Sequence, residues 1–416
     1  MQKDIGIQIQ YYKVMAASFG WIDFSDEQRD RVNAVIDMLS AGGTIDELGV
    51  GSVRDALGDW MFPGVSTIQT RPKYFIILTE ILQNYIRKNI KKEKIKNLDD
   101  YLTNEENRIM HLLAKNHDYK EGDGVIGIKV AKENGELARK ASFIYWNGLR
   151  IHGFINTHLS RTQYVKEYDV SALGNDVSDE ELSSHFDHNF EIKGHQLNVI
   201  NEDMKLDLNM EQAKFIKDQL LDTTHPQKQN YNLLTQLLKD RKREEIVLSA
   251  ANFREAAELL LEVEDLPSET KAILRIALDF DLLMNGAHIR YNIQLHKKAG
   301  TNNYDDLWQE WLLKLETSRF NIERLDFNYV FSEIATGVDT QTQRFMKSWQ
   351  EEILKANRNE IVLDKLVYNQ EISKKGNKAK LILKDGEYQS WVGISGLEYR
   401  FNIVKNIIKD LQAAYA

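Results

Sequence analysis

Apolar residues recur three and four positions apart along most of this 416-residue chain, which is the spacing of one helix face. The pattern predicts a helix within residues 18–40 and a shorter one within 44–62. A third apolar stripe runs through residues 74–86 after Pro72, and proline fits the first position of a helix, where its missing N–H costs nothing. Residues 1–97 are therefore predicted to form an N-terminal helical domain.

Residues 98–165 are predicted to form a helix, a connector and a second helix. Thr103 starts the first helix in a capping pattern, residues 123–130 form a short strand or a loop, and the second helix ends at Gly153. This order is typical of a winged-helix module, whose second helix enters the major groove of DNA. The second helix would present four polar side chains: Arg139, Lys140, Asn147 and Arg150. The alternative is a small helical subdomain without a ligand.

The rest of the chain divides into a connector and a second helical domain. Residues 166–230 are polar and acidic, with a helix expected at 209–221. Residues 231–416 return to helical spacing, and residues 272–298 are apolar on most faces, which predicts a buried central helix. An Asp-Gly pair within Lys378–Gln389 favours a hairpin. The expected fold class is mainly α: a multi-domain helical protein with a winged-helix-like module and a minor β-hairpin.

Composition narrows the class of protein. Apolar residues make up 42% and charged residues 28%, as in ordinary globular proteins, and the 4 prolines favour helices. The absence of cysteine excludes disulfides, iron–sulfur clusters and thiol nucleophiles. The first residues lack the apolar core of a signal peptide, and no apolar run is long enough to span a bilayer. We therefore expect a soluble, cytoplasmic protein.

Charge is unevenly distributed. The formal net charge is -9, which argues against a general nucleic-acid coat. Residues 87–96, however, carry six basic residues and one acid, a local balance of +5, and residues 239–243 and 374–380 are further basic clusters. Residues 176–191 are acidic. The basic clusters are either solvated surfaces or phosphate contacts.

The stretch FPGVSTIQTRPKYF combines several polar groups with the start of a helix. A helix N-terminus presents unpaired N–H groups, and an arginine beside it adds donors suited to phosphate. The candidate nucleic-acid contacts here are Ser66, Thr67, Gln69, Thr70, Arg71 and Lys73. The alternative is that Thr70 or Arg71 caps the helix while Arg71 pairs with an internal acid such as Asp23 or Asp55.

Two further polar groupings have structural alternatives. A metal could be held by the acidic segment that contains His185, Asp187, His188, Glu191 and His195, but a polar loop fits it better because the spacing matches no hydrolase motif. The central helix carries a polar stripe of Asn285, His288, Asn292 and His296, which could line a pocket or form a hydrogen-bonded seam. No nucleotide-binding loop or GxSxG elbow occurs, so we expect no cofactor, no metal and no recognisable catalytic residues.

Three long motifs resemble an uncharacterised bacterial family known only as a domain of unknown function. They are FGWIDFSDEQRDRVNAVIDML, DELGVGSVRDALGDWMFPGVSTIQTRPKYF and ASFIYWNGLRIHGF, and the resemblance extends to the LEYRF segment near the C-terminus. One departure is Pro72-Lys73, where small residues and arginine are expected. The resemblance implies a gene neighbourhood with helicase and phospholipase-D-like proteins, similar to anti-phage defence islands. It carries over no catalytic residue.

These observations lead to three functional hypotheses. The first is a non-enzymatic accessory subunit of a bacterial anti-phage defence system that binds DNA or RNA and works with a helicase-type or phospholipase-D-like partner. The second is a protein–protein scaffold without nucleic-acid contact. The third is a metal-dependent hydrolase or nuclease whose site includes the His185–His195 segment.

Overall fold

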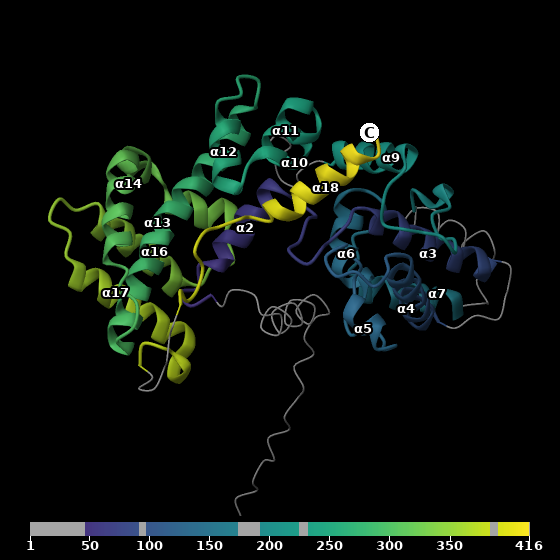
Figure 1. Cartoon of the computed structure of the whole chain (residues 1–416), viewed down its shortest axis with the longest axis horizontal. Coiled ribbons are helices and arrows are strands. Elements are labelled where there is room, and N and C mark those ends of the chain that lie inside the picture. Colours follow the sequence, from purple (N-terminus) through teal and green to yellow (C-terminus); the bar gives the residue numbers. More distant parts are fainter. Residues whose placement is uncertain (1–45, 91–96, 174–191, 224–231, 383–389, 416) are drawn as a thin grey trace, which may run out of the picture. The chain divides into compact units, whose positions relative to one another are not determined.

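The structure is a computed structural model, and it describes residues 46–90, 97–173, 192–223, 232–382 and 390–415. Figure 1 shows the helices in chain order. The first helices are α2 (Gly51–Met61), α3 (Lys73–Ile90), α4 (Leu98–Asn116), α5 (Ile128–Lys132), α6 (Ala141–Ile151), α7 (Arg161–Leu173) and α9 (Met210–Leu221). The later ones are α10 (Leu233–Leu238), α11 (Arg241–Ser249), α12 (Phe253–Leu261), α13 (Ser268–Ala299), α14 (Asp305–Arg324), α15 (Phe327–Tyr329), α16 (Thr340–Ile353), α17 (Glu360–Lys375) and α18 (Phe401–Ala413). Short helical turns are η1 (His195–Leu197), η3 (Val330–Ile334) and η4 (Gly376–Lys378).

The protein is mainly α, as the sequence predicts. Within the described residues, β pairing is limited to one isolated antiparallel bridge between Ile155 and Ile192. The predicted hairpin lies for the most part outside the described residues, which end at 382 and resume at 390. The winged-helix interpretation and the four domain boundaries stay predictions. No helix in the described ranges has the length and apolar character needed to cross a bilayer.

The long helix α13 forms the centre of the C-terminal part of the chain, and its predicted burial is confirmed. It contacts α2, α12, α14 and α17, and apolar side chains such as Leu274 and Leu283 are fully buried. Gly286 lets α14 approach closely, since a Cβ there would lie 2.3 Å from the Trp311 ring. Trp311 in turn donates its indole N–H to the carbonyl of Leu282 at 2.8 Å.

An aromatic core joins the helices of residues 73–155. Helix α3 contacts α4, α6 and α9. The Phe75 ring of α3 stacks on Phe154 with a centroid distance of 4.9 Å and meets the edge of Tyr145 at 5.1 Å. Such ring pairs add to the stability that apolar burial already gives.

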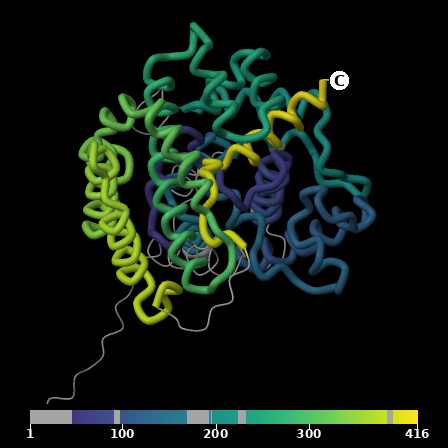
Figure 2. Tube along the Cα trace, turned by 60° about the vertical axis from the view of Figure 1, so that its left-hand side comes forward, coloured from purple at the N-terminus to yellow at the C-terminus, as the bar shows by residue number. Residues whose placement is uncertain are grey.

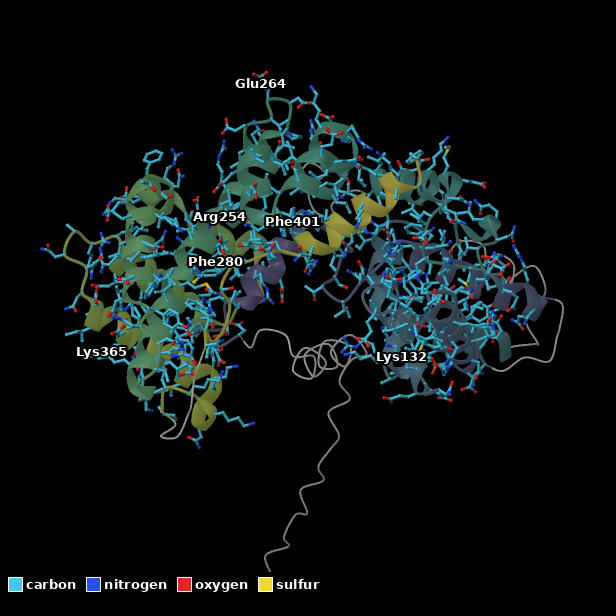
Figure 3. The ribbon with its side chains drawn as sticks, in the orientation of Figure 1. Lys132, Arg254, Glu264, Phe280, Lys365 and Phe401 are labelled. Carbon is cyan, nitrogen blue, oxygen red and sulfur yellow. The ribbon has the colours of Figure 1, made fainter. Side chains whose placement is uncertain are left out.

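The C-terminal helix α18 packs against helices that are distant in sequence. It contacts α9 and α11, and Figure 2 shows this yellow helix near the teal part of the chain. Phe401, which is labelled in Figure 3, lies at the first turn of α18. Its ring centroid is 6.3 Å from that of Phe253. Arg400, just before the helix, pairs with Asp59 of α2 at 2.6 Å.

One local prediction is wrong, and one of two alternatives for a second segment is excluded. Helix α4 begins at Leu98 and not at Thr103, because the Asn97 side chain accepts a hydrogen bond from the backbone N–H of Asp100 at 2.9 Å and caps the helix earlier. The strand alternative for residues 123–130 also fails. Gly124 and Gly127 have positive φ angles, which interrupts any extended run, and α5 then begins at Ile128.

Candidate functional site

Arg71 lies at the meeting point of segments that are far apart in the sequence. Its Nε pairs with the carboxylate of Asp410 in α18, its Nη1 donates to the carbonyl of Asp123 at 3.0 Å, and its Nη2 donates to Asp207 at 3.0 Å. The guanidinium is therefore held by the protein itself. The expected pairing of Arg71 with an internal acid is therefore present, but its partners are Asp207 and Asp410. Asp55, one of the predicted partners, pairs with Arg54, and Asp23 lies outside the described residues.

The neighbours of Arg71 are engaged in the same way. The backbone N–H of Thr70 donates to the Tyr145 hydroxyl at 2.8 Å, and the Thr70 hydroxyl donates to the carbonyl of Gly124 at 2.7 Å. The Tyr145 hydroxyl donates to the Arg71 carbonyl at 2.9 Å, and Lys73 donates to the carbonyl of Asp207 at 2.7 Å. This Arg71 hub, consisting of Thr70, Arg71, Lys73 and their partners, ties α18 to two loops.

The earlier part of the stretch forms a local turn. Gln69 is buried, donates to the carbonyl of Gly64 at 3.0 Å and accepts from the backbone N–H of Ser66 at 3.3 Å. The Ser66 hydroxyl is buried and has no hydrogen-bond partner among the described residues. Thr67 is exposed. These contacts shape the turn that leads into α3.

Electrostatics support the structural role of the hub. Burial lowers the pKa of Arg71, but the hydrogen bonds and charges of Asp410 and Asp207 outweigh it and leave that pKa above its ordinary value. Burial also lowers the pKa of Lys73 and raises that of Asp410. A phosphate would have to displace two carboxylates from Arg71, so the role of these residues in nucleic-acid binding stays a prediction.

Of the four residues predicted on α6, Asn147 and Arg150 lie on the helix, Lys140 is its N-cap and Arg139 precedes it. Lys140 donates to the Thr103 hydroxyl at 2.5 Å, Arg150 donates to the carbonyl of Thr157 at 3.3 Å, and Asn147 is exposed. Arg139 is partly exposed. Tyr145, which faces the hub, is two positions from Asn147, and residues two apart on a helix do not share a face. The structure therefore does not join the two predicted sets into one site.

Most cations of residues 374–380, and half of those of residues 239–243, form ion pairs within the protein. In residues 374–380, Lys374 pairs with Asp339, while Lys375 and Lys380 pair with the buried Glu47 at 3.8 and 2.5 Å. In residues 239–243, Arg243 is buried against Asp265 at 2.7 Å and Arg241 pairs with Glu245 at 3.2 Å. Lys239 and Lys242 of this cluster are exposed.

The described part of the third cluster borders an open pocket of about 530 Å³ between α3 and α4. The residues that each helix contributes include pairs three and four positions apart, which share one face of a helix. The α3–α4 pocket is lined by Asn84, Arg87, Lys88, Tyr101, Glu105, Arg108 and Ile200. Sequence reasoning identified the run that begins at Arg87 but missed the matching stripe on α4.

The lining of the α3–α4 pocket is held in place by specific contacts. Glu80, one turn before Asn84, accepts backbone hydrogen bonds from Val199 at 2.5 Å and Ile200 at 3.2 Å, so it fixes the loop that forms one wall. Lys88 Nζ lies 5.3 Å from the Tyr101 ring centroid. Arg108 donates to Glu105 at 2.8 Å.

The charges in the α3–α4 pocket are not balanced. Its lining holds three cations and one carboxylate, a formal balance of 3 − 1 = +2. Arg87 is exposed and makes no ion pair with any residue that the structure describes. Arg108 is also exposed. A positively charged concave surface of this kind attracts anions.

The polar stripe on α13 forms a hydrogen-bonded seam, which confirms the structural alternative. Asn292 donates to the carbonyl of Val392 at 2.9 Å and accepts from its N–H at 2.8 Å. His296 contacts the carbonyl of Ser390 at 3.0 Å, and Asn285 donates to that of Ser395 at 2.8 Å. His288 contacts the carbonyl of Met284 one turn earlier at 2.9 Å. The stripe therefore holds residues 390–395, which precede α18, against α13 by hydrogen bonds.

The metal hypothesis is not tested by the structure. His185, Asp187, His188 and Glu191 lie outside the described residues, and η1 begins at His195. Among the residues that are described, no three His, Asp or Glu side chains gather in a way that could hold a metal ion.

Comparison with known proteins identifies a family for this chain but no relative whose activity is known. Neither the curated proteins nor the solved structures include a match to the chain. A family described as "Family of unknown function (DUF6361)" matches residues 16–414, which is nearly the whole chain. The protein described here therefore belongs to this family of unknown function, DUF6361.

Proposed function

We propose that this protein is a non-enzymatic nucleic-acid-binding accessory protein, and that the α3–α4 pocket makes the main phosphate contacts. The observation that carries the proposal is the unbalanced charge of that pocket: its single carboxylate, Glu105, pairs with Arg108, so the charges of Arg87 and Lys88 have no counter-charge in the lining. A role in anti-phage defence beside a helicase-type or phospholipase-D-like partner remains part of the proposal, on the resemblance described above.

Comparison with the other basic groups favours this pocket. Arg71 is held by two carboxylates, and the lysines at 374, 375 and 380 pair with internal acids. Groups paired in this way already have their counter-charge within the protein, so a phosphate gains less from them. Arg87 and Lys88 lie near the end of α3 with no carboxylate of the described residues in an ion pair with them.

The sequence that follows α3 is also basic. Residues 91–96 contain four lysines and one glutamate, a balance of 4 − 1 = +3. Phosphate contacts by lysine and arginine supply most of the affinity of sequence-independent nucleic-acid binding, because they release condensed counterions. The proposed binding is accordingly salt-sensitive and tolerant of sequence.

Fluorescence anisotropy with labelled oligonucleotides at low salt tests the proposal. The variant Arg87→Ala/Arg108→Ala removes two exposed cations of the pocket, and Lys239→Ala/Lys242→Ala removes two exposed cations elsewhere as a matched control. We expect the pocket variant to weaken binding at least about tenfold, which corresponds to about 1.4 kcal/mol, and the control to stay near wild type. Equal weakening in both variants, or no binding by wild type, would contradict the proposal.

A protein-binding role is the second candidate, and exposed apolar side chains on α14 favour it. Leu313 and Phe320 are 71% and 65% exposed and lie seven residues apart, so they share one side of the helix. Large exposed apolar side chains often mark contacts with other proteins. Co-purification of a partner with wild type but not with Leu313→Ser/Phe320→Ser, and without dependence on nuclease treatment, would favour this role.

A further inference from the structure

The lining of the α3–α4 pocket is chemically mixed, and this mixture suggests which form of nucleic acid it takes. Beside its cations, the pocket presents the Tyr101 ring, the apolar side chain of Ile200 and the amide of Asn84. A surface that contacts only the phosphates of a duplex needs cations and hydrogen-bond donors, because the bases are stacked inside the helix. The phosphates of a duplex offer no base surface that an aromatic or apolar wall could contact.

We infer that the α3–α4 pocket receives an unpaired nucleotide of a single strand in preference to duplex; this inference rests on the proposed function. Proteins that bind single strands combine a positive groove for the backbone with aromatic side chains on which bases stack. Here Lys88 Nζ lies over the Tyr101 ring, 5.3 Å from its centroid, so the ammonium covers one face of the ring in the free protein. A base that stacks on this face would replace the ammonium, which could then contact the neighbouring phosphate.

The size and rigidity of the pocket fit this ligand. Its volume of about 530 Å³ falls within the ~300–1,000 Å³ typical of small-molecule sites. Glu80 holds the backbone at Val199 and Ile200 with two hydrogen bonds, so the apolar wall is present before a ligand arrives. The Tyr85 ring lies 5.1 Å from the Tyr101 ring and supports it from α3.

The two polar side chains that remain can contact a base edge. The Asn84 amide offers donors and an acceptor. The Glu105 carboxylate offers only acceptors and repels phosphate; its Oε2 accepts from Arg108, and its Oε1 can accept from a ligand. A carboxylate in this position suits an exocyclic amino group of a base. The cations would then contact the flanking phosphates while these two groups lie nearer the base.

The test compares anisotropy titrations of a labelled single strand and of a blunt duplex of the same length, for wild type and Tyr101→Leu. Tyr415→Leu, which replaces a tyrosine that is 47% exposed, is the matched control. We expect wild type to prefer the single strand, and Tyr101→Leu to weaken single-strand binding about tenfold while duplex binding and the control change little. Ile200→Ala, which shortens the wall without touching an aromatic ring, should weaken single-strand binding in the same direction.

The outcomes separate the inference from the proposed function. Tight duplex binding that depends on Arg87 and Arg108 but not on Tyr101 would overturn the single-strand inference and leave the proposed function standing. Equal losses for both ligands in Tyr101→Leu would also overturn it. No binding of either ligand by wild type would remove both.

Discussion

Replacing Arg71 with alanine should destabilise the fold strongly. The change removes a cation whose side chain is 18% exposed and leaves the Asp410 carboxylate, 11% exposed, without its partner. Breaking a well-buried ion pair costs about 3–5 kcal/mol, and the more exposed pair with Asp207 adds under about 1 kcal/mol. Because the Arg71 pair is not fully buried, we expect a total near the lower end, about 3–4 kcal/mol.

Urea unfolding followed by circular dichroism measures this loss. The control is Arg241→Ala, which removes an ion pair whose side chains are 62% and 61% exposed and should cost less than about 1 kcal/mol. Adding Asp410→Asn to Arg71→Ala should restore at least about 1 kcal/mol, because it removes the unpaired buried charge. If Arg71→Ala costs no more than Arg241→Ala, the hub is not a stabilising contact.

The same variant should depend on pH in a defined direction. Burial already raises the pKa of Asp410 in the folded protein, and loss of Arg71 would raise it further. The folded variant would then bind a proton more tightly than the unfolded chain, so its destabilisation should shrink as the pH is lowered toward that pKa. A destabilisation that does not change with pH would contradict the assignment to Asp410.

Three other predictions follow from the described contacts. Gly124→Ala should lower the free energy of unfolding more than Gly122→Ala does. Both residues have positive φ, but only at Gly124 would a Cβ lie 2.5 Å from Arg71 Cγ. Equal losses in urea unfolding would show that Arg71 does not crowd this position. Burial lowers the pKa of His152 to about 3, so this residue should reduce wild-type stability by up to about 1.4 kcal/mol per pH unit between pH 6.5 and about 3. Urea unfolding across that range should show a smaller fall in His152→Gln than in wild type, and equal falls would contradict the assignment. Asn292→Ala should cost about 1–3 kcal/mol and speed hydrogen exchange at the Val392 amide, with Asn285→Ala, which loses one exposed bond, as the milder control.

The sequence predicted those helices whose signals, such as a proline or a hydrophobic spacing, lie within the helix or next to it. Pro72 directly precedes α3, and the apolar run of residues 272–298 lies wholly within α13. Hydrophobic spacing depends only on neighbours three and four positions away, so it can be read from the chain. The start of α4 could not be predicted from the local pattern, because both Asn97 and Thr103 are residue types that cap helices. Which of them is the cap depends on the backbone N–H that its side chain contacts, and in the folded protein Asn97 accepts from Asp100.

Side-chain partners could not be predicted in the same way. Arg71 is 339 positions from Asp410, and no local pattern indicates that α18 packs there. The α3–α4 pocket likewise depends on two helix faces and a loop at Ile200 that meet only in the folded protein. Identifying the basic run at Arg87 was possible from composition, but its pairing with Tyr101 and Arg108 required the packing of α3 on α4.

The salt dependence of oligonucleotide binding tests the central claim most directly. Each phosphate contact contributes about 0.7 to the slope of log affinity against log salt for a single strand and about 0.9 for duplex. Loss of Arg87 and Arg108 should therefore reduce the single-strand slope by about 1.4, whereas Lys239→Ala/Lys242→Ala should leave it unchanged. The same slope in wild type and in the pocket variant would contradict the account, because it would show that the α3–α4 pocket does not contact phosphate.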